Sequence, residues 1–179
     1  MRSGQRQRGY SITEMLTVVA IIGIVSLILV PNFMSMYRIG KIKSATRNFI
    51  ARVRRVQQQA VTLNRRMRIS FTPNTRTYTI WTERTNPTTG VRTWVQQGFE
   101  QPLEEAGAAN KSGVISFGTT NFDDKDSDSI NDIVYNPNGT LDVPSGITGD
   151  PFLQIKTSDR IPRPTITVTF SVSGSVKVT

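Results

Sequence analysis

The chain opens with a short polar stretch and then becomes almost entirely apolar. Between residues 15 and 30 only Thr17, Gly23 and Ser26 interrupt a run of large apolar side chains and alanine. Apolar residues on both sides extend this segment to 10–37, which approaches the length of about 20 residues that a bilayer-spanning helix needs. The pattern therefore predicts a membrane-spanning helix at this end of the chain.

A second helical pattern follows directly. Apolar side chains recur mostly at three- and four-residue steps, the spacing of one helix face: Met36, Ile39, Ile42, Phe49, Ile50, Val53, Val56, Ala60 and Leu63. We expect 38–64 to be the amphipathic half of the same helix, with this face on a sheet and an end at Asn64. Pro31 lacks a backbone N–H and crowds the preceding turn, so it predicts a kink or a locally melted stretch.

After residue 64 the period changes from helical to alternating, which predicts a β-rich head over 65–179. The expected strands are 67–71, 77–81, 91–95, 114–117, 133–135, 152–155, 165–172 and 175–178. Turns at Pro73-Asn74 and at Ser173-Gly174 predict two hairpins, and Ile166, Val168, Phe170 and Val172 should share one face. The predicted fold class is α+β, with one long helix packed on an antiparallel β-sheet head.

Composition excludes several kinds of chemistry. The chain has no histidine and no cysteine, which removes Ser-His and Cys-His catalysis, zinc-thiolate sites and disulfides. Carboxylates are concentrated in one loop, so no pair of nucleophile and base can be proposed. We expect no enzymatic activity and no required cofactor.

The junction at Glu14 carries the strongest functional signal. An ionised side chain inside a membrane costs on the order of 2.5–3.5 kcal/mol, so it usually has a partner and a role. A secretory signal peptide would need a small-x-small cleavage site, which 30–33 does not supply. A simple membrane anchor would leave Glu14 unexplained. The basic residues before the apolar segment predict a cytoplasmic N-terminus; they are Arg2, Arg6 and Arg8.

Residues 9–16, Gly-Tyr-Ser-Ile-Thr-Glu-Met-Leu, resemble the class III signal of type IV pilins and type II secretion pseudopilins, usually Gly-Phe-Thr-Leu-Ile-Glu-Leu. Pro31 stands where that family carries its helix-kinking proline, and Tyr10 and Thr13 are mild departures. The resemblance implies that 1–9 is a leader, which a prepilin peptidase removes after Gly9 before methylating the Tyr10 amine. Glu14 would then face that amine or a neighbour's and set the register of assembly.

The resemblance also implies a location and partners. The chain would cross the inner membrane once, with its head in the periplasm, and would later enter a pilus or a secretion pseudopilus. Its partners would be the prepilin peptidase, other pilin or pseudopilin subunits, the inner-membrane assembly platform and membrane lipid. The sequence leaves open which of the two machines it serves.

The head resembles the GspH/FimT-like group of minor pilins and pseudopilins. The matching segments are the helix end over 51–60, Arg68-Ile69-Ser70-Phe71, the turn over 135–140 and the closing hairpin over 166–178. This likeness favours a minor structural subunit, while the sequence alone leaves open whether the subunit is minor or major.

An acidic run over 124–132 predicts a structural calcium site. Calcium prefers six to eight oxygen ligands from a loop that folds round it. Carboxylates at every second position, the carbonyl of Ile130 and a further carboxylate could supply them, and the run resembles calcium loops of thrombospondin type 3 repeats. The carboxylates are those of Asp124, Asp126, Asp128 and Asp132. The alternative is a polar surface loop, since Ser129 replaces the usual glycine.

The second functional hypothesis is a competence pilin whose head binds DNA. Some FimT-like pilins use a C-terminal Gly-Arg-x-Arg motif, where this chain has Gly174-Ser175-Val176-Lys177 and so lacks both arginines. Phosphate neutralisation needs several cations on one face. Lys177 with Arg160 and Arg163 would be the candidates, and ordinary loop solvation is the alternative.

Overall fold

The computed structural model describes residues 10–103, 115–122, 130–143, 147, 149–157 and 165–179. For positions 28, 30–35 and 38, it describes the backbone but not the environment of the side chains. The chain divides into two compact units, Met1–Gly40 and Lys41–Thr179. Each unit is described by itself below.

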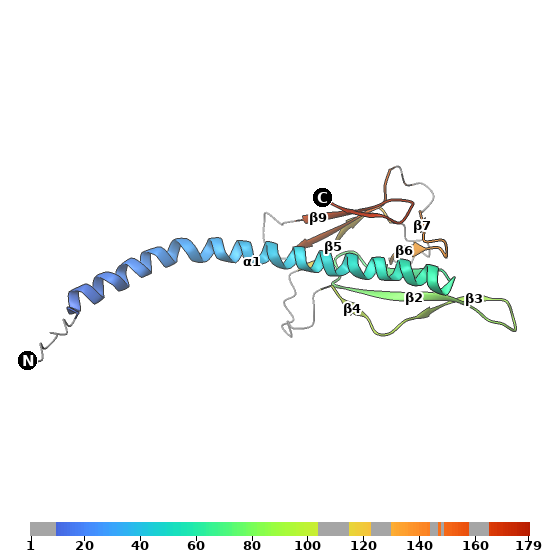
Figure 1. Cartoon of the computed structure of the whole chain (residues 1–179), viewed down its shortest axis with the longest axis horizontal. Coiled ribbons are helices and arrows are strands. Elements are labelled where there is room, and N and C mark those ends of the chain that lie inside the picture. Colours follow the sequence, from blue (N-terminus) through green and yellow to red (C-terminus); the bar gives the residue numbers. More distant parts are fainter. Residues whose placement is uncertain (1–9, 104–114, 123–129, 144–146, 148, 158–164) are drawn as a thin grey trace, which may run out of the picture. The chain divides into compact units, whose positions relative to one another are not determined.

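One helix, α1, runs from Ile12 to Leu63 (Figure 1). Its first turn is closed by the backbone N–H groups of Glu14 and Met15, which both donate to the carbonyl of Ser11 at 3.1 Å. It ends where predicted, because Asn64 takes a positive φ of 49°, a left-handed conformation that asparagine tolerates. The backbone is helical through Pro31, so the structure has no melted stretch there, and the kink stays a prediction.

Among the residues that the structure describes, no helix has both the length and the apolar character needed to cross a membrane. The predicted span over 10–37 includes positions 28 and 30–35, whose side chains lie outside this description.

The head contains two antiparallel sheets. The six-stranded sheet has the order β3-β2-β1-β6-β7, with β4 also paired to β2. Its strands are β1 (Met67–Phe71), β2 (Thr77–Thr85), β3 (Arg92–Gln96), β4 (Gln101–Pro102), β6 (Asn131–Tyr135) and β7 (Leu141–Asp142). The four-stranded sheet has the order β10-β9-β8-β5. Its strands are β5 (Ile115–Thr120), β8 (Phe152–Thr157), β9 (Thr165–Phe170) and β10 (Val176–Val178).

Both predicted hairpins are confirmed. Asn74, with a φ of 66°, lies in the turn that joins β1 to β2, and Gly174, with a φ of 84°, lies in the turn that joins β9 to β10. One expectation about the second hairpin is wrong. Val172 does not share the buried face of β9, because the strand ends at Phe170 and Val172 lies in the turn, where it is exposed.

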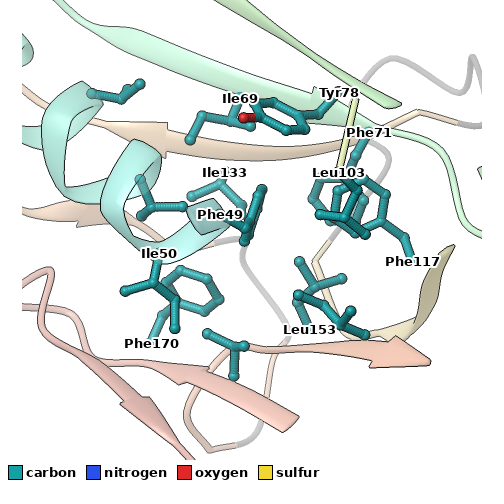
Figure 2. Packing of buried hydrophobic residues seen from close by; sticks show 14 of the residues in the cluster. Phe49, Ile50, Ile69, Phe71, Tyr78, Leu103, Phe117, Ile133, Leu153 and Phe170 are labelled. Carbon is teal, nitrogen blue, oxygen red and sulfur yellow. The ribbon is translucent and has the colours of Figure 1, made fainter. Parts of the chain in front are cut away.

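The core of the head is formed by α1 and both sheets (Figure 2). Phe49 of α1 meets Tyr78 of β2 edge-on, with ring centroids 5.3 Å apart, and meets Phe117 of β5 in the same way at 5.4 Å. The helix therefore packs on two sheets at once. The buried positions of α1 are Ile42, Ala45, Thr46, Phe49, Ile50, Val53, Val56 and Ala60.

The predicted apolar face of the helix was too long at both ends. Met36 and Ile39 are exposed at one end and Leu63 at the other. A helical face is buried only where a sheet lies opposite it, and spacing along the chain does not show where that contact starts and stops.

Candidate functional site

The predicted assembly residues lie at the start of α1. Tyr10 precedes the helix and its side chain is 76% exposed, while Glu14 lies exposed in the first helical turn. A carboxylate at this end is favoured by the helix dipole. Within the described part of this single chain, the Glu14 side chain makes no hydrogen bond or ion pair. Gly9 lies outside the described residues.

Apolar side chains are exposed all round the first unit's helix. Each is between 46% and 80% exposed: Ile12, Met15, Leu16, Val18, Val19, Ile21, Ile22, Ile24, Val25, Leu27 and Leu29. A soluble helix normally keeps a polar face, and one that is apolar on every side needs an apolar environment, which can be lipid or other helices. We therefore expect lipid or other helices to cover this segment.

A charge network lies on the outer face of the six-stranded sheet. Arg68 of β1 donates from Nη1 to Asp132 Oδ2 of β6 at 3.0 Å, and Ser70 Oγ donates to Asp132 Oδ1 at 2.6 Å. The two charged side chains are only 14% and 10% exposed. Strand alternation explains the placement, since Arg68 and Ser70 face away from the core that Ile69 and Phe71 enter.

Both tryptophans of the chain flank this network. The Arg68 guanidinium lies 5.2 Å from the Trp81 ring centre and 4.9 Å from that of Trp94, within the range of cation–π attraction. Arg66 lies 5.9 Å from Trp94 and forms an ion pair of 2.5 Å with Asp142. This arginine–tryptophan cluster was not predicted from the sequence. The available signal was a charged residue in the middle of a strand of buried apolar residues.

The calcium prediction is only partly covered by the structure. Asp124, Asp126 and Asp128 lie outside the described residues. Ile130 directly precedes β6, and Asp132 is a strand residue whose two carboxylate oxygens already accept bonds from Arg68 and Ser70. Calcium at Asp132 would have to compete with that arginine. The calcium site stays a prediction.

The proposed DNA-binding cations are not brought together by any described contact. Arg160 and Arg163 lie outside the described residues. Lys177 lies exposed on β10, opposite Thr169 of β9.

Gly174, at the position of the DNA-binding motif, has a packing role instead. A Cβ there would lie 2.1 Å from Gln57 Nε2 and 2.6 Å from the carbonyl oxygen of Gly139, both far inside contact distance. Gln57 Nε2 itself donates to the Gly139 carbonyl at 2.8 Å. The two turns that resemble the minor-pilin group therefore meet at the end of α1.

Comparison with known proteins agrees with this arrangement. The prokaryotic N-terminal methylation motif matches residues 4–30. The structure is similar to that of the minor pseudopilin EpsH from the type 2 secretion system of Vibrio cholerae. The TM-score is 0.51 at 12% sequence identity, over 78% of this chain and 96% of the other.

The methylation motif agrees with the type IV pilin signal, and the likeness to EpsH agrees with the fold of the head. The motif confirms the pilin-type signal that was recognised in residues 9–16. The likeness to EpsH confirms the α+β fold with an N-terminal helix and antiparallel sheets. The motif bears on the N-terminal segment of this pilin-like chain, and at 12% identity the likeness to EpsH bears on the fold alone. No curated protein matches the sequence.

Proposed function

We propose that this protein is a structural subunit, of the minor class, in a type IV pilus or a type II secretion pseudopilus. The chain would be cut after Gly9, methylated on the amine of Tyr10 and assembled through the first part of α1. The observation that carries the proposal is the helix that is apolar on every side, behind a methylation motif, with Glu14 in its first turn.

Glu14 can account for the preference for a fibre over the bilayer. Apolar side chains gain little when lipid contacts are exchanged for contacts with other helices, because both surroundings are apolar. A carboxylate within the membrane is costly, by on the order of 2.5–3.5 kcal/mol, and an amine opposite it in a bundle compensates that cost. The charge pair would therefore favour the fibre over the bilayer, while the apolar residues would supply most of the contact area between helices.

The same reasoning supports a membrane location before assembly. The methylation motif precedes an apolar helix, and the arginines of the leader favour a cytoplasmic N-terminus with the head on the far side. The partners would be the prepilin peptidase, the assembly platform, lipid and other subunits. Similarity to the fold of a minor pseudopilin supports the minor class.

No observation on the described residues favours the DNA-binding alternative. Lys177 is a single exposed cation on an edge strand, and a phosphate-binding face needs several.

Mass spectrometry of the native protein tests the proposal. The expected result is a terminus at Tyr10 that carries one added methyl group, and co-expression with an inactive peptidase should leave residues 1–9 attached. An intact start at Met1 in the presence of active peptidase, or a terminus at another residue, would overturn the proposal.

A further inference from the structure

An open pocket of about 360 Å³ lies where α1 ends and β1 begins. Three arginines from separate segments line it: Arg65 beyond the helix end, Arg66 just before β1 and Arg92 at the start of β3. The rest of its wall is formed by Asn64, Glu83, Thr85 and Pro137. All of these residues belong to the head.

Arg66 is held in place before any ligand arrives. Its Nη2 pairs with Asp142 at 2.5 Å, its Nη1 lies 3.8 Å from Glu83, and its guanidinium lies against Trp94. Its Nε is buried and has no hydrogen-bond partner among the described residues. A guanidinium fixed in this way loses little side-chain entropy when it binds.

The other two arginines are available. Arg92 lies 3.8 Å from Glu83, a loose ion pair, and its side chain is 67% exposed. The Arg65 side chain is exposed and makes no ion pair or hydrogen bond with any part of the chain that the structure describes. Arg68, only two residues beyond Arg66, is by contrast already paired with Asp132.

The charge balance selects the class of ligand. Three arginines against the two carboxylates of Glu83 and Asp142 leave an excess of one positive charge. That excess matches a carboxylate, whereas a phosphate dianion would meet the repulsion of Glu83 with too few cations. Guanidinium groups also match the planar geometry of a carboxylate.

We propose that this pocket binds a carboxylate side chain, or an acidic segment, of a partner protein. The arginines at 65 and 92 would donate to the carboxylate, Arg66 would supply a fixed positive charge, and Pro137 would form an apolar wall. The proposal goes beyond the proposed function, because it concerns a recognition site on the head and does not depend on cleavage or fibre assembly.

Titration calorimetry on the full chain in detergent micelles tests the site. The probe is a peptide of alternating glutamate and glycine, and its control has glutamine in place of every glutamate. Tryptophan fluorescence provides a second measurement, because the Trp94 ring lies 5.9 Å from the Arg66 guanidinium. We expect the acidic peptide to bind, the amide peptide not to bind, and affinity to fall as salt rises.

A matched pair of variants separates the site from general attraction to a positive chain. Arg65→Gln with Arg92→Gln should weaken binding at least about tenfold, since two charge-assisted hydrogen bonds are lost. Arg54→Gln with Arg55→Gln removes the same charge from exposed positions on α1 and should leave affinity within about twofold. Equal losses in both variants, no binding at all, or tighter binding of inorganic phosphate than of the peptide would each overturn the proposal.

Discussion

Gln57 of α1 donates a hydrogen bond of 2.8 Å to the carbonyl of Gly139, which lies 82 positions further along the chain. Gly174, in the β9–β10 turn, lies so close to the same amide that no side chain fits between them. Nearby, the backbone N–H of Leu141 donates to the carbonyl of Val172 at 3.0 Å, which joins the two sheets. The end of the helix, the six-stranded sheet and the last hairpin are thus tied together at one point.

The first prediction is that Gly174→Ala destabilises the head by roughly 2–4 kcal/mol, through a strained positive φ and a steric clash. Urea denaturation followed by circular dichroism measures this change. Gly98→Ala is the control, because Gly98 also has a positive φ, of 74°, but open space around its Cβ position. It should cost about 1 kcal/mol. Equal losses in the two variants would show that the Gln57 contact is unimportant.

The second prediction concerns the ion pair between Arg68 and Asp132. Asp132→Ala removes the carboxylate that pairs with a largely buried arginine and should cost about 2–4 kcal/mol, somewhat less than for a fully buried pair. Asp150→Ala removes an exposed carboxylate and should cost under about 0.5 kcal/mol. Replacing Arg68 and Asp132 together by leucine should be less harmful than Asp132→Ala alone. If the double variant is the worse of the two, the pair does not act as described.

The third prediction concerns Tyr135, which is fully buried in the core and whose hydroxyl has no hydrogen-bond partner among the described residues. Tyr135→Phe removes an unsatisfied polar atom and should stabilise the head by about 1 kcal/mol. Thermal denaturation at neutral pH measures the change. A loss of more than about 1 kcal/mol would show that the hydroxyl is satisfied in solution.

The same residue predicts how stability falls in alkali. Burial raises the pKa of Tyr135 above its usual value of 10.0. Above pH 10.0 the unfolded chain therefore releases this proton while the folded chain keeps it, so the free energy of unfolding falls with rising pH. Burial also raises the pKa of Tyr78, against an opposing effect of Arg52. Tyr135→Phe should make the alkaline decline shallower, and an unchanged slope would contradict this account.

The fourth prediction is that Glu14→Ala leaves membrane insertion and cleavage largely intact but stops incorporation into fibres. The variant still has the apolar helix, but it lacks the carboxylate that would compensate a neighbouring amine. Immunoblots of sheared filaments and of membranes measure the two pools. Thr17→Ala, which removes an exposed hydroxyl that donates to the carbonyl of Thr13 within the same helix, should assemble normally. Normal assembly of the Glu14 variant would contradict the mechanism.

Much of the fold could be predicted from local patterns. The strand β1 was predicted to the residue and the helix end to within one residue, because an αL-tolerant Asn64 and strict alternation after it are local signals. The strands β4 and β7 were missed, since two residues are too few to show a period. The division into two sheets was also not predicted, because pairing such as that of β1 with β6 depends on distant segments.

The candidate sites also divide into those that a local pattern predicts and those that depend on contacts between distant segments. The processing and assembly residues could be predicted because they follow one another within a short motif. Asp132 was assigned to a calcium loop from its spacing along the chain, although its described partners, Ser70 and Arg68, lie on a neighbouring strand. The pocket at the end of α1 was not foreseen, since its arginines converge only after the sheet has formed.

The shared core also sets an order of events during biosynthesis. Ile50 of α1 and Phe170 of β9 belong to one buried cluster, yet the ribosome makes them far apart in time. At about 5–20 residues per second the delay is on the order of ten seconds. Throughout that interval the apolar face of α1 is not covered by β9. We expect the nascent head to depend on chaperones that cover this apolar face. Slower elongation through the β9–β10 hairpin should increase misfolding.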